Sequence, residues 1–311
     1  MYSTFVNRKF PHEVYKVLNS MSKVIDNYVD YCGYIHDKLI EEVPFGEYEL
    51  PIPLLFGQII NTVDSISLLT QKGQTNGVRP LLRMLIESRL TLMYLLDQDI
   101  ERGCKAYIVS HVQKEISTRR LFDQSEEKGK RLSSQLKEMF DLDANHESYP
   151  KKPINESAKH LFALLDKEEM YDVTQEWIRT KKEKRNRVPE WYSLYNGPNN
   201  LRELAQYFKE EPTYDVMYQT LSSYIHGGAA LKTLRVAEDN ESVIPVFRDI
   251  EGLQTLVTWT INLISDLVLR MLEKYLPELK QHYADWYTKE VRKVHLKIAG
   301  TKLYKTVYKS H

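Results

Sequence analysis

Three polar residues recur at a spacing of four near the end of a predicted helix: Tyr218, Ser222 and His226, in the stretch YQTLSSYIHGG. In an α-helix this spacing places all three side chains on one stripe. A phenol, a hydroxyl and an imidazole on one stripe can hold a phosphate and transfer a proton, which is general acid–base chemistry. The alternative is packing, because Gly227 supplies a helix stop and the helix dipole favours a protonated His226 in the last turn.

A second candidate pair lies upstream in VRPLLRMLIESRLTLMYLL, where Arg83 and Glu87 are one helical turn apart. Eleven of the sixteen residues from 81 to 96 are apolar, which predicts a helix buried on most sides. Because an unpaired buried charge is costly, we expect Arg83 and Glu87, together with Arg79 on the same face, to point at one another or at a polar group of another helix. Such a group either stabilises charge at a site or fixes the packing of two helices.

A basic run followed by aromatic residues, KKEKRNRVPEWYSLY, is the candidate nucleic-acid surface. Its candidate binding residues are Lys181, Lys182, Arg185, Arg187 and Trp191. Cations neutralise phosphates and an aromatic ring stacks on bases, so this combination suits RNA. The alternative is a solvated charged face, because Lys plus Arg and Asp plus Glu balance at 43 each and the chain as a whole attracts neither nucleic acid nor an anionic membrane.

Other catalytic signatures are absent from the sequence, including phosphate-binding glycine loops and the zinc-protease helix motif. The remaining histidines show no ligand spacing with a second histidine or cysteine, so we expect no metal and no cofactor. The cysteines, Cys32 and Cys104, lie far apart, and the start MYSTFVNRKF has no apolar leader. Together these features predict a reducing, cytoplasmic location.

The elements that must position these residues are helices, because nearly every long segment has helical periodicity. We predict an all-α helical bundle in which a hairpin from Leu54 to Leu96 packs against helices Tyr214 to His226 and Leu253 to Tyr275. Short β-branched runs around EDNES allow at most a minor β-hairpin. The segments 81–96 and 253–272 carry too many polar groups for a membrane span, so we expect no membrane partner.

We predict one helical domain over residues 1–311. Its core is expected at about 54–112 and 189–276, with a polar helical excursion at about 114–188 and a basic C-terminal tail at about 289–311. The helix LQTLVTWTINLISDLVLRML is apolar on more than one face, which predicts a homodimer.

The segments RPLLRMLIESRLTLMYLL and PEWYSLYNGPNNLRELAQYF…YDVMYQTLSSYIHGG together resemble a family of bacterial all-helical proteins catalogued as a domain of unknown function. That family shows an arginine and a glutamate on an early buried helix, a W-Y segment and an S-x-x-x-H-G helix end. The resemblance covers roughly residues 56–96 and 189–230. More distantly, the arrangement is similar to HEPN-type nucleases and abortive-infection proteins of phage defence.

That distant likeness implies RNA cleavage without metal by an arginine and a histidine of an R-x(4–6)-H motif at a dimer interface. This sequence departs from the motif, because no arginine stands among residues 219–222, where one is expected before His226. The arginine would have to come from another helix, with Arg83 as the candidate, or from a second subunit.

Two hypotheses follow. The first is a metal-independent ribonuclease or toxin-type effector of defence, with His226 as general acid and base, Arg83 stabilising the charged phosphorus centre, Glu87 orienting Arg83, and Tyr218 and Ser222 binding phosphate. The second is a non-catalytic helical module that binds a partner protein or ligand, in which the same residues form a structural polar network. Both require Arg83 or Glu87 to reach the stripe of His226, and we expect a contact with His226 or Ser222.

Overall fold

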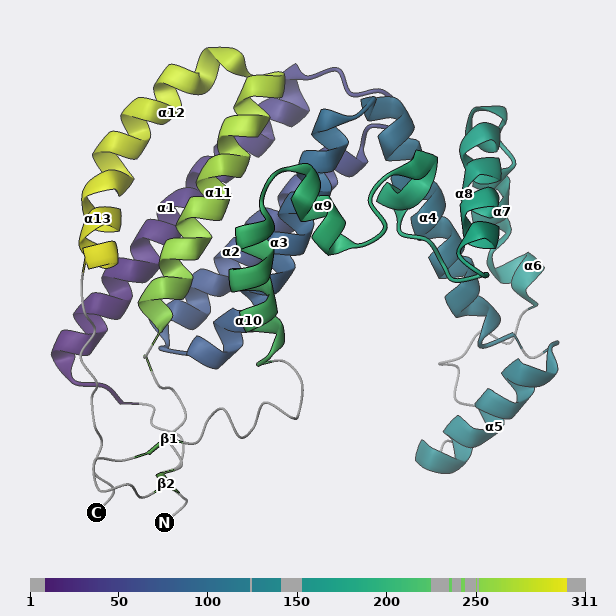
Figure 1. The fold of residues 1–311 in the computed structure, drawn as a ribbon, viewed down its shortest axis with the longest axis horizontal. Coiled ribbons are helices and arrows are strands. Elements are labelled where there is room, and N and C mark those ends of the chain that lie inside the picture. Colours follow the sequence, from purple (N-terminus) through teal and green to yellow (C-terminus); the bar gives the residue numbers. More distant parts are fainter. Residues whose placement is uncertain are drawn as a thin grey trace. The chain divides into compact units, whose positions relative to one another are not determined.

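The computed structural model describes residues 9–123, 125–140, 153–224, 235–236, 242–243, 250 and 252–300. It confirms the all-α class (Figure 1). Within the described residues the strands are β1 (Arg235–Val236) and β2 (Ser242–Val243), which pair antiparallel with Arg235 opposite Val243. The second strand begins at the last residue of the EDNES segment, around which the minor hairpin is predicted.

The chain divides into two compact units at boundaries that differ from the predicted core and excursion. The first unit comprises residues 1–45, 52–97 and 205–311, and the second comprises 46–51 and 98–204. The predicted excursion at 114–188 therefore belongs to a larger body with its own core. Apolar stripes predict that a helix is buried, but they do not say against which partner.

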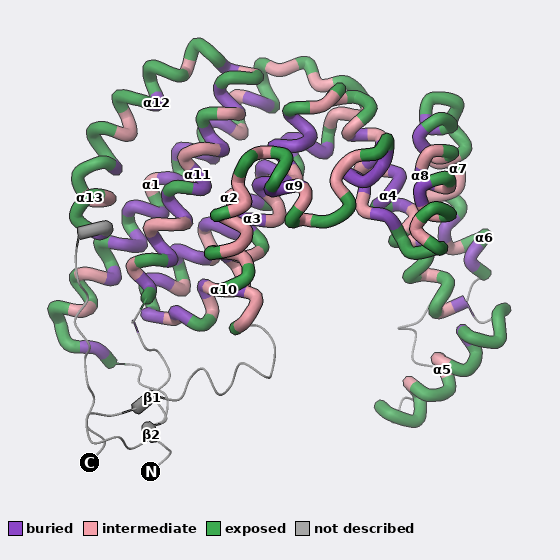
Figure 2. Tube along the Cα trace, viewed as in Figure 1, coloured by how far each residue is buried: buried purple, intermediate pink, exposed green. Residues whose placement is uncertain are grey.

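The first unit is built from long helices and several short helical segments. In chain order these are α1 (His12–Glu42), α2 (Pro51–Gln71), α3 (Thr75–Asp97), the π-helix η3 (Thr213–Tyr218), α10 (Gln219–Ser222), α11 (Leu253–Tyr275), η5 (Pro277–Leu279), α12 (Lys280–Trp286), the π-helix η6 (Tyr287–Val291) and α13 (Arg292–Gly300). In Figure 2 the long helices carry buried residues along one side and exposed residues along the other.

The predicted hairpin is formed by α2 and α3, which are joined by a short turn at Gly73. This glycine has φ +65°, and a Cβ there would lie 2.8 Å from Cζ of Phe10. Glycine is therefore needed both for the left-handed backbone and for the space. The third helix begins at Thr75, so Pro80 lies inside it.

The core of the first unit lies where α11 contacts α3 on one side and α1 on another. Leu82 and Ile86 of α3 and Leu267 and Met271 of α11 are fully buried. By length and composition alone, α2 and α11 could each cross a membrane. In the most apolar stretch of each helix, 50% of the residues of α2 and 56% of those of α11 are buried inside the protein. The core helix of a soluble protein passes the same test, so this is weak evidence for a membrane.

The predicted basic tail is helical over its described part. Residues 287–300 form η6 and α13, and α13 contacts both α11 and α1. Val291 is fully buried and Ile298 is 4% exposed, so the apolar side of this segment covers the core. Residues 301–311 lie outside the described residues. The basic residues gave this segment its polar character in sequence, whereas its few apolar residues decided where it packs.

The second unit contains α4 and a set of shorter helices. These are α4 (Ile100–Arg120), α5 (Glu127–Phe140), α6 (Ile154–Ser157), α7 (Lys159–Leu165), η1 (Glu168–Met170), α8 (Tyr171–Glu183), η2 (Trp191–Asn196) and the first part of α9 (Leu201–Tyr207). One core cluster consists of Val112, Ile116, Ile154 and Ala158. Within this unit α4 contacts both α8 and η2. The side chains of α5 are mostly exposed (Figure 2).

Candidate functional site

The segment from Glu210 to Tyr224 lies along α3 in the opposite direction. Its contacts follow one order: Glu210 meets Arg89, Tyr218 meets Arg83 and Glu87, and Tyr224 meets Arg79. Figure 1 shows α10 beside α3, and the two helices are in contact. We call the middle and end of this contact the polar seam; its members are Arg79, Arg83, Glu87, Tyr218, Ser222 and Tyr224.

The Tyr218 hydroxyl is the centre of the polar seam. It donates to Oε1 of Glu87 at 2.7 Å and accepts from an NH2 group of Arg83 at 2.7 Å. Nε of Arg83 lies 3.0 Å from the same Glu87 oxygen as an ion pair, but its N–H does not point at that oxygen well enough for a hydrogen bond. The Arg83 guanidinium also lies 4.8 Å from the centre of the Tyr218 ring. The pair on α3 thus meets the facing stripe through its tyrosine.

The electrostatic environment fixes the charge states of this group. Burial raises the pKa of Tyr218, and its hydrogen bond to Glu87 raises it further, against a smaller lowering by Arg83. Burial lowers the pKa of Arg83, but the hydrogen bond with Tyr218 and the charge of Glu87 outweigh it and leave that pKa raised. At neutral pH the site therefore holds a neutral phenol that donates and a guanidinium that stays charged.

Arg83 or Glu87 was expected to contact Ser222 or His226, and the structure shows no hydrogen bond of either residue to Ser222. The Ser222 Oγ is buried and has no hydrogen-bond partner among the described residues. It lies one turn beyond Tyr218 on the same helix face. His226 and Gly227 belong to residues 225–234, which lie outside the described residues, so the part of the prediction that concerns the histidine stays a prediction.

The expectation that Arg83 and Glu87 are the buried charges of α3 is wrong. Their side chains are 29% and 42% exposed, whereas Arg89 is 3% exposed. Arg89 lies six residues after Arg83, which is about 240° around a helix with 3.6 residues per turn, and so it faces the interior. The apolar run of α3 indicated that some charge must be buried, but only the neighbouring helices decided which one.

Arg89 joins two carboxylates from other segments in an ion network, here called the Arg89 clamp. Its two NH groups each donate to Glu210 at 2.7 Å, and one also binds Asp266 of α11. Asp266 accepts from Nε of Arg270 at 3.0 Å as well. Burial raises the pKa of the Asp266 carboxyl, but the charges and hydrogen bonds of Arg89 and Arg270 together outweigh this and leave the pKa below its usual range. The clamp fixes the start of the segment that carries Tyr218.

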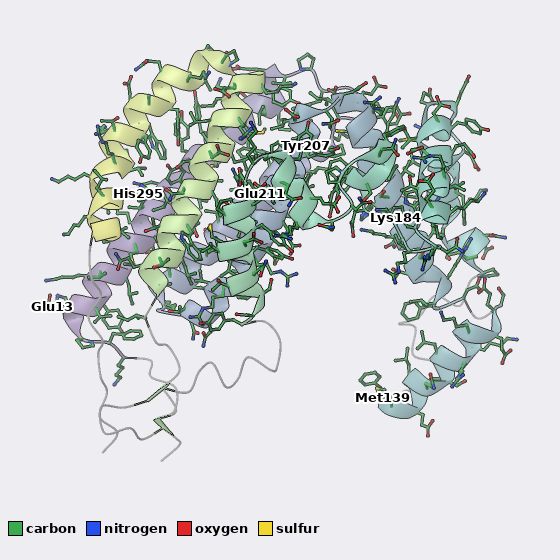
Figure 3. The ribbon with its side chains drawn as sticks, in the orientation of Figure 1. Glu13, Met139, Lys184, Tyr207, Glu211 and His295 are labelled. Atoms are coloured by element: carbon green, nitrogen blue, oxygen red, sulfur yellow. The ribbon has the colours of Figure 1, made fainter. Side chains whose placement is uncertain are left out.

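The segment itself departs from a regular helix. The predicted α-helix from Tyr214 is a π-helix over residues 213–218, and Tyr218 is its last residue. Single-turn π segments often occur at functional sites, because the extra residue turns a side chain toward a partner. Figure 3 labels Tyr207, the last residue of α9, and Glu211, just before the π-helix; the Tyr207 hydroxyl also donates to Asp97 of α3.

The candidate nucleic-acid surface lies in the second unit, at the end of α8. Lys182, Arg185 and Arg187 are exposed, and Figure 3 labels Lys184 in the same stretch. Lys181 is half-buried, with its ammonium 4.9 Å from the ring centre of Trp177. These cations are therefore accessible to solvent, and their contact with nucleic acid stays a prediction.

Trp191 does not suit the predicted role of stacking on bases. It is 7% exposed, and its ring packs edge-on against Tyr107 and Tyr192. The nearby exposed aromatic residue is Tyr195, at 40% exposure, with Arg102 lying 5.1 Å from its ring centre. Tyr195 has φ +57°, an unusual conformation for an aromatic residue. Sequence patterns cannot distinguish buried from exposed aromatic residues within one short run.

No group of three His, Cys, Asp or Glu side chains within the described ranges could hold a metal ion.

Among known proteins, one family model matches the chain, over residues 49–243, and it is described as a family of unknown function, DUF5677. The matched range includes both α3 and the segment that faces it. No curated protein matches the chain, and neither does any solved structure.

Proposed function

Because the chain belongs to the DUF5677 family, whose function is unknown, we propose an activity from its own site: a metal-independent ribonuclease or toxin-type effector of bacterial anti-phage defence. The observation that carries the proposal is the convergence of Arg83, Glu87 and Tyr218 from two segments more than 130 residues apart in the chain. Their side chains are partly exposed, so a substrate can reach them.

In the proposed reaction the ribose 2′-hydroxyl of RNA attacks the adjacent phosphorus. The P–O5′ bond breaks, giving a 2′,3′-cyclic phosphate and a free 5′-hydroxyl. His226 takes the proton of the 2′-hydroxyl and, once protonated, gives it to the leaving 5′-oxygen. Arg83 stabilises the extra negative charge on the phosphoryl oxygens, and Glu87, acting directly and through Tyr218, keeps Arg83 in position.

The alternative function is a non-catalytic helical module that binds a partner protein. The observation that favours it is that the Tyr218 hydroxyl already donates to one side chain and accepts from another. A fully satisfied polar group of this kind fixes the register of two helices and needs no substrate to explain it.

Expression in bacteria separates the two functions. The wild type is expressed beside Arg83→Gln, His226→Ala and the control His111→Ala, which removes an exposed histidine of the second unit. Growth and the integrity of total RNA are followed, and purified proteins are incubated with RNA in the presence of EDTA. The proposal expects RNA loss with the wild type and the control only, at unchanged melting temperature. Intact RNA with the wild type, or cleavage that survives His226→Ala, contradicts it.

We also propose a cytoplasmic homodimer. The apolar faces of α11 that suggested two-fold pairing are covered within the first unit by α3 and α1, so the dimer no longer follows from that helix. What supports it is the likeness to HEPN-type nucleases, whose site lies between two subunits. Light scattering at micromolar concentration tests the dimer, and the mass of one chain would contradict it.

A further inference from the structure

The last helical segment, η6 with α13, carries a concentration of positive charge that the proposed reaction does not use. Residues 287–300 contain four cations and a single carboxylate, that of Glu290. We call the cations the basic face: Lys289, Arg292, Lys293 and Lys297, all of them exposed. Burial lowers the pKa of His295, so this ring adds no charge at neutral pH and the segment has a net charge of +3.

Packing turns the basic face toward solvent. Val291 is fully buried and Ile298 is 4% exposed, because α13 lies on α11 and α1. Figure 1 shows α13 beside α1. Lys293 and Lys297 are four residues apart in α13 and therefore share one stripe, with Arg292 next to it. The apolar residues of the segment thus fix the cations on its outer side.

The neighbouring helix α1 adds a further cation at the level of α13. The Tyr31 hydroxyl of α1 lies 2.9 Å from Nδ1 of His282, and the Asn27 side chain donates to the backbone carbonyl of Glu290 at 3.3 Å. Because lower residue numbers of α1 meet higher numbers of the last segment, the two run antiparallel. One turn further toward the start of α1 stands Lys23, which is exposed and so lies at the level of α13.

The helices under α13 bring few carboxylates to the basic face within the described residues. Glu290 forms an exposed ion pair with Lys289 at 3.3 Å. In α11 the Gln254 side chain donates to the backbone carbonyl of Ile298, and residues 253–265 of this helix include no charged side chain. The side of α11 on which α13 packs is therefore neutral.

The carboxylates of α1 lie elsewhere. Asp26 accepts a hydrogen bond from the Ser67 hydroxyl of α2, and Glu13 lies 3.9 Å from the ammonium of Lys16 on its own helix. Asp30 comes after Asn27 in the sequence, which places it at the level of α12. The basic face is thus a local surplus of positive charge in a chain whose formal net charge is zero, and such a surplus attracts a polyanion.

The backbone of a nucleic acid suits this face better than a membrane does. From Lys289 to Lys297 is about 12 Å along a helix, several times the roughly 3.4 Å between the phosphates of one duplex strand. A helix that lies on a membrane has a broad apolar side next to its cations. In the described part of η6 and α13 the exposed large apolar residue is Leu296 alone, at 64% exposure.

We propose that the basic face binds the sugar–phosphate backbone of RNA, with Arg292 and Lys293 as its central contacts. The charge, the exposure and the packing of α13 support binding to a phosphate backbone. That the nucleic acid is RNA rests on the proposed function. These cations hold the substrate and take no part in the bond-breaking step, so their loss raises KM for RNA and leaves kcat unchanged.

Fluorescence anisotropy with a labelled single-stranded 2′-O-methyl RNA tests the proposal. The methyl group blocks the 2′-hydroxyl, so binding is measured without cleavage. The double variant Arg292→Gln, Lys293→Gln should bind on the order of tenfold more weakly at about 0.1 M salt. The plot of log K against log salt should be less steep by about 1.4, because each contact with a single strand contributes about 0.7. The melting temperature should not change, since both side chains are exposed.

The matched control is Lys274→Gln, Lys280→Gln. It removes the same charge from the first unit, at exposed positions near the end of α11 and the start of α12, and should leave the affinity and its salt dependence nearly unchanged. Vesicles of equal amounts of phosphatidylcholine and phosphatidylserine form a parallel arm. The wild type should bind the RNA and not the vesicles.

Equal affinity and equal salt dependence of the wild type and the double variant would overturn the inference, as would no binding of the RNA by the wild type. A loss of the same size in the control would also overturn it, since the effect would then come from net charge alone. Vesicle binding that the double variant loses, with RNA binding unchanged, would assign the face to a membrane.

Cleavage of unmodified RNA separates this inference from the proposed function. If the 2′-O-methyl RNA binds as expected but unmodified RNA is not cleaved, the ribonuclease proposal fails while the RNA-binding face stands. If the wild type and the double variant cleave RNA with equal KM and bind it equally, the face is refuted and the ribonuclease proposal stands.

Discussion

Replacement of Arg89 by methionine should be the most destabilising single change in the first unit among the charged residues of α3. Arg89 is 3% exposed and joins Glu210, 18% exposed, and Asp266, 42% exposed. Without its guanidinium the Glu210 carboxylate loses the partner of both its oxygens, and Asp266 keeps only Arg270. Removing one partner of a buried pair costs about 3 to 5 kcal/mol, a large part of the roughly 5 to 15 kcal/mol that a domain has in all.

The matched comparison is Glu87→Ala on the same helix. Its ion pair with Arg83 is partly exposed, with side-chain exposures of 29% for Arg83 and 42% for Glu87. A pair of this kind contributes up to about 1 kcal/mol, and the hydrogen bond from Tyr218 adds about 1 kcal/mol. Arg89→Met should therefore destabilise the first unit more than Glu87→Ala, although both remove one charge from α3.

The assay is denaturant unfolding followed by hydrogen exchange and mass spectrometry on peptides from α3 and α11. These peptides report the first unit alone, which matters because two compact units need not unfold together. A second arm combines Arg89→Met with Glu210→Gln and Asp266→Asn, which should recover part of the loss, since no unpaired carboxylate remains.

A pH series supplies the sign of the effect. In Arg89→Met the Glu210 carboxylate, which is 18% exposed, has lost the guanidinium that both its oxygens bind. Its charged form is then disfavoured in the folded state, so the variant loses stability relative to the wild type as pH rises. The difference from the wild type should therefore shrink on acidification from about pH 7 to about pH 5. An Arg89→Met protein as stable as Glu87→Ala, or one whose deficit grows on acidification, would refute the reasoning about the clamp.

Three further outcomes are expected. Tyr218→Phe should abolish RNA cleavage while lowering stability by only about 1 kcal/mol, measured by urea unfolding, because it deletes one hydroxyl and keeps the ring; full cleavage by this variant would remove Tyr218 from the site. The pKa of Asp266 is lowered, so this carboxylate stabilises the folded state above the ordinary aspartate pKa of about 4, and the stabilisation is lost on acidification below that pKa. The free energy of unfolding of the wild type should therefore fall more between about pH 5 and about pH 3 than that of Asp266→Asn. The double variant Arg185→Gln, Arg187→Gln should lower RNA affinity and reduce its salt dependence by about two phosphate contacts, whereas Trp191→Phe should lower stability and leave RNA affinity unchanged, since that ring is buried. Filter binding over a salt series measures the RNA affinity of both variants. Weaker RNA binding by Trp191→Phe would contradict the burial argument.

The sequence by itself determined the helices and which of their faces are apolar. In α1 the periodic positions Leu18, Met21, Ile25 and Tyr28 are all buried, as their spacing predicts. The hairpin of α2 and α3 also followed from the sequence, because the turn at Gly73 is a local signal. Periodicity is a property of neighbouring residues, so it can be read without knowing the fold.

Only the tertiary structure decided which polar residues meet and which charge is buried. The bonds of Arg89 reach residues 121 and 177 positions further along the chain, and that of Arg83 with Tyr218 spans 135. The π-helix that ends at Tyr218 and the burial of Trp191 also depend on neighbours from distant segments. The sequence correctly indicated that α3 must bury a charge, since so apolar a helix has little exposed surface. The choice of Arg89 over Arg83 came from the carboxylates that other segments bring to its face, because a buried charge is stable only where a partner of opposite charge is available.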